Sequence, residues 1–311
     1  MSVPSDALNV VLDPEGGAGE RAPLDETRTA SRLGLIGRRF MKRRLAVVGL
    51  VILAGLFVLA FLGPYLVKWD HTDHDFAAFL QGPSLTHPFG TTATGADVYA
   101  LTLRGMQKSL IIGLLVALLS TAMSAVVGAF AGYMGGWVDR VLMWFVDLLL
   151  VIPGFLVLAI VSPAFRGETW LLFVLLLAAF IWMITARIVR GMTITLRDRE
   201  YVQAARFMGV STPRIIFRHI LPNISSLLII DATINVSVAI IGETSLSYFG
   251  FGVQPPDVSL GTLIADGTNS AVTYPWLFAF AAGLLVLIVL AVNLIGDGLR
   301  DAIDPTSGHK T

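Results

Sequence analysis

Polar residues within apolar segments are the first candidates for chemistry in this sequence. The apolar stretch 224–248 contains a set of small or polar residues that fall within about 40° of one helix face, at 100° per residue: Asp231, Asn235, Gly242 and Ser245. Polar groups are costly in lipid, so this stripe must face protein or water. We interpret it as a candidate lining of a translocation path; hydrogen bonding between packed helices is the alternative.

Asp147 is a further ionisable residue inside an apolar stretch, 138–161, and it joins the same candidate set. An intramembrane carboxylate is a functional candidate because its desolvation is costly. Glu243 lies off the stripe, near one end of its segment, so we expect it to be solvated or paired. Gly128 and Gly132 form a GxxxG pattern, which permits close approach of helices and favours internal packing.

The stretch WDHTDHD, residues 69–75, combines histidine and aspartate side chains that could bind a divalent metal ion. It lies in a hydrophilic segment, where solvated charges are ordinary, so we expect no metal site at His71 and His74. His87 stands in a turn-like stretch. His219 is expected to pack or to form a hydrogen bond rather than to ligate a metal.

The sequence contains no pattern typical of nucleotide hydrolysis or hydrolytic catalysis. It has no GxxxxGK[ST] phosphate loop, no HExxH, no GxSxG and no GxGxxG after a strand. It has no cysteine, which excludes disulfides and thiolate chemistry. The formal net charge is zero, so no basic field favours nucleic acid. We expect no catalytic residues, no cofactor bound by this chain and no nucleic-acid partner.

Composition places the chain among membrane proteins. Of its 311 residues, 55% are hydrophobic and 14% are charged, against roughly a quarter charged in soluble domains. Six stretches are long enough to cross a bilayer as helices, which needs about 20 apolar residues: 45–67, 110–133, 138–161, 170–190, 224–248 and 274–295. We predict an all-α membrane protein with six transmembrane helices.

Lysine and arginine are unevenly distributed in this topology. Six spans place both termini on one side, and that side has 18 of the 22 lysines and arginines. The other side has Lys68, Arg104, Lys108 and Arg166. Positive residues concentrate on the cytoplasmic side. We therefore expect cytoplasmic termini and a cytoplasmic loop at 191–223, with 69–108 and 249–273 facing outward.

The spans divide the chain into regions. Residues 1–32 are rich in proline, glycine and acidic residues, so we expect a disordered cytoplasmic tail. The remaining regions are an anchor helix, an external segment, a core and a short tail, at 33–68, 69–108, 109–305 and 306–311. Because the first span follows a long hydrophilic tail, we do not interpret it as a cleaved signal peptide. Gly135 and Gly136 favour a turn between the second and third spans over one long bent helix.

A charged stretch, EYVQAARFMGVSTPRIIFRHILPN, separates the fourth and fifth spans. We expect Asp198 to cap a short helix that ends at Gly209, a typical left-handed terminus. Thr212 is expected to cap a second helix with Pro213 as its first residue, and Pro222 to break that helix. The pattern predicts two short helices with a glycine elbow. They could lie on lipid headgroups or form a docking surface for a soluble protein.

This stretch resembles a known motif. The pattern of Gln203-Ala204-Ala205, Gly209 and Leu221-Pro222 resembles the EAA loop of ABC-transporter permeases. Five blocks, in order, resemble the dipeptide, oligopeptide and nickel permease family, and within it the C-type subunit: 87–98, 132–160, 186–191, 242–256 and 293–305. The resemblance implies a type I ABC importer permease fold and a coupling helix that fits a groove on the ATPase. The residues implied in that contact are Glu200, Tyr201, Gln203, Ala204, Ala205, Met208, Gly209, Arg214, His219, Leu221 and Pro222.

The resemblance also implies a function and partners. The chain would form half of a translocation pathway for peptides in the cell membrane of a prokaryote, working by alternating access. Its implied partners are a homologous B-type permease, two ATPase subunits or domains that bind ATP and Mg²⁺, an extracytoplasmic substrate-binding protein and the lipid bilayer. The sequence departs from the family pattern at Gln203, where glutamate is usual, and at Thr92, Ala96, Met106 and Gln107.

Other functions are compatible with parts of the sequence. A proton-coupled secondary transporter would use Asp147 or Asp231 as a proton carrier, although the sequence has no inverted repeat. An ABC permease for nickel complexes or glutathione would share the fold and differ in substrate. An intramembrane enzyme would need a catalytic constellation, and the sequence offers none.

Overall fold

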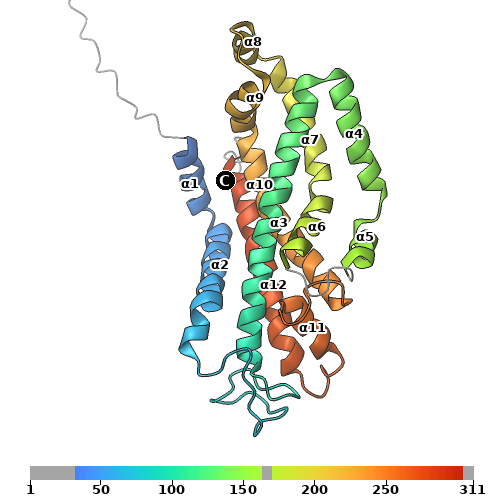
Figure 1. The fold of residues 1–311 in the computed structure, drawn as a ribbon. Coiled ribbons are helices and arrows are strands. Elements are labelled where there is room, and N and C mark those ends of the chain that lie inside the picture. Colours follow the sequence, from blue (N-terminus) through green and yellow to red (C-terminus); the bar gives the residue numbers. More distant parts are fainter. Residues whose placement is uncertain (1–31, 163–169, 304–311) are drawn as a thin grey trace, which may run out of the picture.

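The computed structural model describes residues 32–162 and 170–303. Two predicted regions lie outside the described residues: the tail 1–32, apart from Arg32, and the tail 306–311. Arg166, which was predicted to face outward, also lies outside them. Within the described part the fold is a bundle of helices, which confirms the all-α prediction (Figure 1). The elements are α1 (Arg32–Lys42), α2 (Arg44–Leu62), the 3₁₀ turn η1 (Gly63–Leu66), α3 (Val98–Met134), α4 (Gly136–Val151), α5 (Gly154–Val161), α6 (Trp170–Ile181), α7 (Met183–Arg197), α8 (Glu200–Phe207), α9 (Thr212–Ile215), the π-helical turn η3 (Ile216–Ile220), α10 (Leu221–Tyr248), α11 (Leu260–Thr268) and α12 (Trp276–Ile303).

Four helical stretches of the described chain are long and apolar enough to cross a membrane. They are Arg44–Leu66, Val98–Met134, Thr212–Tyr248 and Trp276–Ile303. Two bent pairs, α4 with α5 and α6 with α7, raise the number to six if each pair forms one span. The helices therefore agree with the prediction of six spans, but two of the spans are broken rather than straight.

The third predicted span, 138–161, is wrong as a single helix. α4 ends at Val151, and α5 begins at Gly154 at an angle of 75° to it. Pro153 stands between them, and proline lacks a backbone N–H and disfavours helical backbone in the residue before it. Ile152 accordingly has extended backbone, with φ −79° and ψ 123°.

The fourth predicted span, 170–190, is also bent, and it is longer than expected. α6 and α7 meet at an angle of 49°, and α7 continues to Arg197. Trp182 lies at the bend, where it is buried and its indole N–H donates to the Ala179 carbonyl at 2.9 Å. The additional turns of α7 bring its basic end next to α8.

α3 lies in the middle of the bundle, in contact with α7, α10, α6, α11 and α4 (Figure 1). It has 37 residues and begins at Val98. The last part of the predicted external segment, 69–108, is therefore helical and continuous with the second span. Asp97 sets this start because its side chain accepts the Ala100 N–H at 2.8 Å, which caps the helix.

Two glycines form the turn between the second and third spans. Gly135 and Gly136 have φ of 63° and 55°, in the left-handed region that glycine adopts without steric cost. The Gly135 N–H donates to the Ala131 carbonyl at 3.0 Å and closes α3. The Asp139 N–H donates to the Gly135 carbonyl at 3.2 Å and opens α4. This arrangement confirms the predicted turn.

His87 fastens the external segment to the start of α3. His87 begins a turn, as predicted, in which the Gly90 N–H donates to the His87 carbonyl at 2.8 Å, and its side chain is buried, with 2% exposed. Its Nδ1 lies 2.7 Å from an Asp97 carboxylate oxygen, and its Nε2 lies 3.5 Å from Asp75. The imidazole also lies against the indole of Trp69, with ring centres 5.2 Å apart. The residue that caps α3 is thereby tied to the segment that precedes it.

The contact between α3 and α7 depends on two glycines. A Cβ atom at Gly128 would lie 2.4 Å from the Ala186 carbonyl oxygen, and one at Gly132 would lie 2.6 Å from the Arg190 carbonyl oxygen. Both distances are far below van der Waals contact, and backbone cannot move aside as a side chain can. The GxxxG pattern therefore serves internal packing between two helices of the same chain, as predicted.

We predict that Gly128→Ala will destabilise the protein by about 1–3 kcal/mol, because the added methyl group forces the two helix backbones apart. Gly191→Ala is the matched control: this glycine lies on α7 and a Cβ there would meet nothing within 4 Å. The control should be neutral or slightly stabilising, since alanine is the better helix former. Thermal unfolding of both purified variants in detergent measures the difference. Equal melting temperatures would contradict this account of the contact.

Candidate functional site

The protrusion, residues 200–220, extends beyond the membrane-spanning helices at one end of the molecule (Figure 1). α8 begins at Glu200 with Arg199 in the capping position, so the predicted cap at Asp198 is wrong by one residue. No side chain caps this end, but the Gln203 side-chain amide donates to the Asp198 carbonyl at 3.3 Å. The helix starts with an acidic residue in its first turn, which suits the helix dipole.

α8 ends as predicted at a left-handed glycine. Gly209 has φ of 75°, and its N–H donates to the Arg206 carbonyl at 3.0 Å. The Val210 N–H donates to the Ala205 carbonyl at 3.1 Å. These two bonds form a Schellman motif, which satisfies carbonyls that the helix end would otherwise leave free. The elbow is therefore a hydrogen-bonded corner rather than a loose loop.

The predicted break at Pro222 is wrong. α9, η3 and α10 form one helical stretch from Thr212 to Tyr248. The turn at η3 is π-helical: the Leu221 N–H donates to the Ile216 carbonyl, five residues back. This wider turn accommodates a residue that has no N–H to donate. The Asn223 side chain donates to the His219 carbonyl at 2.6 Å, so this carbonyl in the π turn has a hydrogen-bond partner.

The capping of α9 is shifted by one residue from the prediction. Ser211 occupies the capping position, Thr212 is the first helical residue and Pro213 is the second. Proline is tolerated anywhere in the first turn, because the N–H groups there have no partner within the helix. A second helix does begin here, as predicted. It does not end before Pro222, however, but continues into the fifth span.

The inner face of the protrusion rests on the bundle. Val202 and Ala205 of α8 are 1% and 2% exposed, and they belong to one apolar cluster with Ala129 of α3, Val189 of α7 and Ile216. Ala205 is therefore a base residue of the protrusion and not a contact residue at its surface. This corrects the expectation that Ala205 takes part in the contact with the ATPase.

The outer face of the protrusion is exposed and partly apolar. Phe207 is 87% exposed and Met208 is 76% exposed. Tyr201, Gln203 and Ala204 are exposed beside them. Phe207 was absent from the predicted set of contact residues. Helical periodicity could have identified it, because Phe207 does not fall on the face of α8 that contains Val202 and Ala205.

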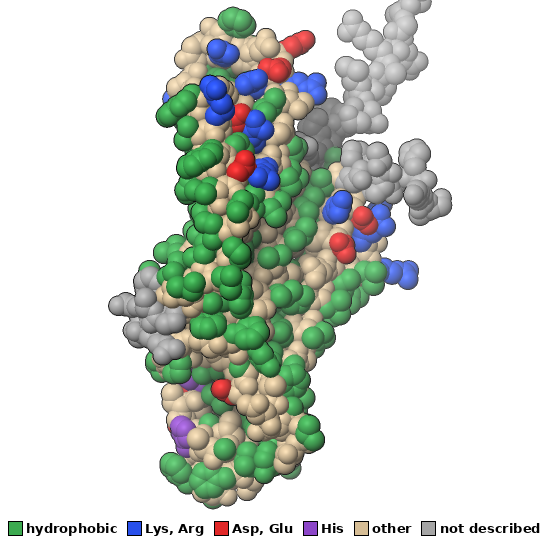
Figure 2. All heavy atoms as spheres, turned by 90° about the vertical axis from the view of Figure 1, so that its right-hand side faces the viewer, with side chains coloured by type: hydrophobic (Ala, Val, Ile, Leu, Met, Phe, Trp, Pro, Cys, Tyr) green, Lys and Arg blue, Asp and Glu red, His purple; other side chains and the backbone are tan. Residues whose placement is uncertain are grey.

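The other predicted contact residues lie lower on the protrusion. Glu200, Arg214 and Pro222 are exposed, while His219 and Leu221 are half-buried. Lys and Arg side chains gather at this end of the molecule (Figure 2). The end therefore combines a small apolar tip with a basic surround.

A polar cluster joins three helices inside the bundle. The Asp231 carboxylate of α10 accepts hydrogen bonds from Thr185 of α7 at 2.6 Å and from Thr121 of α3 at 3.1 Å. Asn235, one turn along α10, donates to the same carboxylate at 2.9 Å. Two of the predicted path residues thus meet in one network, and their partners are helices of the same chain.

The remaining predicted path residues lie elsewhere. Asp147 on α4 is half-exposed and ion-paired with Arg187 of α7. Gly242 is half-buried, and a Cβ there would lie 3.5 Å from a Leu177 methyl group. The Ser245 hydroxyl donates to the Ile241 carbonyl of its own helix at 2.8 Å. The assignment of these residues to a translocation path stays a prediction.

Glu243 is fully buried, so the expectation of a solvated residue is wrong. Its carboxylate accepts hydrogen bonds from the Ser109 hydroxyl at 3.1 Å and the Ser247 hydroxyl at 2.6 Å. Ser109 in turn accepts the Leu260 N–H at 3.2 Å, and Ser247 accepts the Val253 N–H at 3.2 Å. One carboxylate thereby links α3, α10, the loop after α10 and the start of α11.

The loop after α10 is fixed by further polar contacts. Gly250 has φ of 79°, in the left-handed region that glycine adopts without steric cost. Asp257 lies 3.0 Å from the Lys108 ammonium, which is buried over the ring of Trp170. Ser259 caps α11 by accepting the Thr262 N–H at 3.2 Å. The loop is thus held at the end of the bundle opposite the protrusion.

The histidines of the external segment have ordinary polar partners. His71 is paired with Asp70, and the Nδ1 of His74 lies 3.0 Å from the Thr72 carbonyl oxygen. Among the described residues, no group of three histidine or acidic side chains could hold a metal ion.

Long apolar helices, two of them broken, with a helical protrusion at one end, define a multi-pass subunit of a membrane transport system. Residues 124–308 match the family described as binding-protein-dependent transport system inner membrane component. Residues 31–83 match the N-terminal transmembrane domain of oligopeptide transport permease C. The chain belongs to this family of transport permeases, within its OppC-like branch, and is a membrane protein of the prokaryotic cell membrane.

Curated relatives match nearly the whole chain. The oligopeptide transport system permease protein OppC of Mycobacterium tuberculosis is 57% identical over 282 residues, which cover 90% of this chain and 97% of that protein. The protein of the same name in Escherichia coli is 41% identical over 86% of this chain and 89% of that protein. A peptide permease protein of Brucella suis is 38% identical over the same shares. A solved structure of the MetNI methionine ABC transporter covers 66% of this chain and 97% of its own, with 18% identity and a TM-score of 0.48.

We predict that Glu243→Leu will destabilise the protein by about 2–4 kcal/mol, because two buried hydroxyl groups lose their acceptor. Glu243→Gln keeps one acceptor oxygen and should cost about 1 kcal/mol or less. Glu200→Gln, at an exposed position, is the control: it removes a charge that suits the dipole of α8, so it should cost less than about 1 kcal/mol and should leave the proteolysis of residues 249–259 unchanged. Thermal unfolding measures the stability, and limited proteolysis between residues 249 and 259 reports on the loop. A Leu variant as stable and as resistant as the wild type would refute the linking role of Glu243.

Proposed function

We propose that this chain is the transmembrane subunit of an ATP-binding-cassette importer that takes up oligopeptides. Relatives that match nearly its whole length are named oligopeptide transport system permease proteins, at 57% and 41% identity. The observation that carries the proposed coupling role is the exposed tip of the protrusion, where Phe207 and Met208 lie on a helix firmly based on α3 and α7.

The proposed orientation puts the protrusion and both termini in the cytoplasm. The basic residues support this, because cytoplasmic loops concentrate lysine and arginine, and they gather at the protrusion end (Figure 2). The non-helical chain between η1 and α3, residues 67–97, and the loop that follows α10 then face outward. In this orientation the outer loop lies where an extracytoplasmic substrate-binding protein would deliver a peptide.

The proposed coupling contact inserts the apolar tip into a partner ATPase. Phe207 and Met208 would enter an apolar groove, with Tyr201, Gln203 and Ala204 beside them. A few large side chains that become fully desolvated in a pocket of the partner supply most of the binding energy of an interface, and the exposed Phe207 could act in this way. Gln203 has no charge, so this contact would depend on burial and hydrogen bonding rather than on an ion pair at that position.

Movement of the tip would reach the far end of the molecule through one helix. The stretch Thr212–Tyr248 has 37 residues and therefore a length of about 55 Å. It connects the base of the protrusion to Glu243 and the outer loop. Rocking of this helix with α3 and α7 would alternate the access of the pathway between the two sides.

The importer would need further components for ATP hydrolysis and for the second half of the pathway. Its sequence has no phosphate loop, so ATP and Mg²⁺ would bind in two partner ATPase subunits or domains. A homologous permease would supply the other half of the pathway. The half-exposed Asp147, and the stripe of Asp231, Asn235, Gly242 and Ser245, are the proposed polar residues of the path.

We predict that Phe207→Asp will reduce both co-purification of the ATPase and ATP-driven peptide uptake by about tenfold or more, because a charge replaces an apolar anchor. Phe76→Asp is the matched control: Phe76 is 76% exposed at the opposite end, so the same change there should leave ATPase binding intact. The amount of ATPase retained on the purified permease measures the contact.

Two outcomes would overturn parts of the proposal. If the Phe207→Asp variant retained as much ATPase as the wild type, the tip of the protrusion would not be part of the contact. Uptake that persists with an inactive ATPase, and that follows a proton gradient, would favour the secondary transporter instead. Ala205→Leu serves a different purpose: because Ala205 is buried, this change should lower the stability of the protrusion and not only its affinity for a partner.

A further inference from the structure

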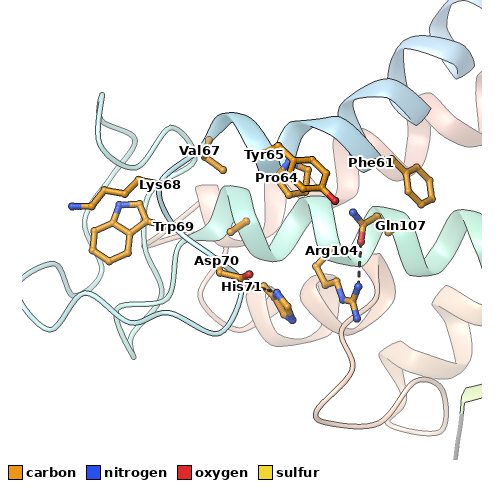
Figure 3. Close-up of a pocket in the computed structure, with 11 residues that line it drawn as sticks. Phe61, Pro64, Tyr65, Val67, Lys68, Trp69, Asp70, His71, Arg104 and Gln107 are labelled. Atoms are coloured by element: carbon orange, nitrogen blue, oxygen red, sulfur yellow. Dashed lines mark hydrogen bonds and ion pairs between the residues drawn. The ribbon is translucent and has the colours of Figure 1, made fainter.

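A cavity of about 460 Å³ lies where the first membrane-spanning helix ends. Its walls come from three segments: the last turns of the span at Phe61 and Tyr65, the chain that follows at Lys68 and Asp70, and the first turns of α3 at Arg104 and Gln107 (Figure 3). The volume is in the range of small-molecule sites. Nothing in the proposed transport function uses this cavity.

The cavity lies at the boundary between lipid and water. The span Arg44–Leu66 has 23 residues, about 35 Å of helix, which is enough to cross the hydrocarbon core. Lys68 and Trp69 follow directly after it, and Tyr65 is 85% exposed at its end. Tyrosine and tryptophan at such a point are typical of the headgroup level of a membrane. This placement holds whichever side of the membrane the cavity faces.

Arg104 is positioned to bind an anion in this cavity. Its guanidinium has five N–H donors, and it donates one hydrogen bond, at 3.3 Å, to the Gln107 side-chain oxygen. It lies 3.8 Å from Asp257, whose carboxylate is closer to Lys108 at 3.0 Å. Its side chain remains 37% exposed. Beyond these two contacts, part of its donor capacity remains available to a ligand in the cavity that it lines.

Gln107 holds this arginine in place. Its amide N–H donates to the Ala60 carbonyl near the end of α2, at 2.7 Å. The same side chain offers its oxygen to Arg104, so one glutamine connects α2, α3 and the guanidinium (Figure 3). Lys68 and Arg104 against Asp70 leave the cavity with an excess of positive charge, which suits a phosphate group.

An apolar groove of about 390 Å³ lies at greater depth on the seam between α2 and α3. Its lining includes Leu53 and Phe57 of α2 and Leu110 and Leu114 of α3, and its floor is completed by residues of α10 and α12. Leu114 is two turns beyond Gln107, about 10 Å further along the helix. A polar cavity at headgroup level and an apolar groove at acyl-chain level therefore follow one another along the same two helices.

We propose that this seam is a binding site for a membrane phospholipid, with its phosphate at Arg104 and an acyl chain in the groove of Leu53, Phe57 and Leu114. The phosphate of a lipid is a monoanionic diester, which Arg104 can bind through two parallel N–H···O bonds. The bound lipid would fill the seam between α2 and the rest of the bundle. The site would recognise the phosphate and one acyl chain of the lipid, and not the rest of the headgroup.

The test uses the full chain, purified with the subunits that accompany it, stripped of lipid and titrated in detergent. Native mass spectrometry counts bound lipid for three probes: phosphatidylglycerol, diacylglycerol with the same chains and no phosphate, and glycerol 3-phosphate with no chains. We expect the phospholipid to bind about tenfold more tightly than diacylglycerol, the loss typical of a charge-assisted contact. Glycerol 3-phosphate should not compete with it at equal concentration.

Three variants locate the site. Arg104→Gln should lower phospholipid binding about tenfold, to the level of diacylglycerol, while Arg104→Lys, which keeps the charge but not the two parallel bonds, should bind at a level between Arg104→Gln and the wild type. Arg140→Gln, on exposed α4, is the control and should bind as the wild type does. Leu114→Trp fills the groove from a side chain that is 46% exposed, so it tests the site without disturbing the core. It should weaken binding of both lipids.

Three results would overturn the proposal. Equal binding of diacylglycerol and phospholipid would mean that the cavity does not recognise phosphate. Competition by glycerol 3-phosphate at equal concentration would mean a site for free anions rather than for a lipid. Unchanged phospholipid binding in the Leu114 variant, or in a folded Arg104→Gln variant, would place the lipid elsewhere. Should Arg104→Gln fail to fold, the Leu114 variant and the comparison of probes decide the matter.

Discussion

The near contact of two helix backbones, α3 and α7, is the constraint on which the rest of the fold depends. Gly128 and Gly132 let the helices approach until a methyl group no longer fits between them. This approach places Ala129 and Val189 side by side, and these two residues form the floor on which the protrusion rests. It also brings Thr121 and Thr185 within reach of Asp231 on the third helix of the group.

Stiffness is built into the protrusion by local backbone chemistry as well as by packing. The Schellman corner at Gly209 satisfies the end of α8, and the π turn before Pro222 lets the chain enter the next span without a gap in the helix. A hinge at either place would absorb movement. In the described protrusion both places are closed by backbone hydrogen bonds, and the helix that begins at Thr212 continues into α10.

The sequence predicted the features that depend on local patterns. Hydropathy located the apolar spans, and the left-handed preference of glycine located the turn at Gly135 and the elbow at Gly209. The features that it missed depend on distant partners. Whether Pro222 breaks a helix is decided by a π turn, and the burial of Glu243 is decided by Ser109, which lies 134 positions earlier in the chain.

The candidate site shows the same division. The order of the residues along the chain was enough to identify the loop as a candidate site. It was not enough to predict which of its side chains are buried and which are exposed. Ala205 and Phe207 are two residues apart, yet one is buried against α3 and α7 and the other is 87% exposed. The difference is set by where the bundle lies beneath α8, and no local pattern contains that position.

The partners of Glu243 also fix an order of events during synthesis. Translation makes Ser109 long before the carboxylate, while Leu260, which completes the network, emerges 17 residues after it. The buried carboxylate of α10 thus depends on one hydroxyl from a helix synthesised earlier and on loop segments synthesised later, so a chain that ends before α11 would lack part of this network.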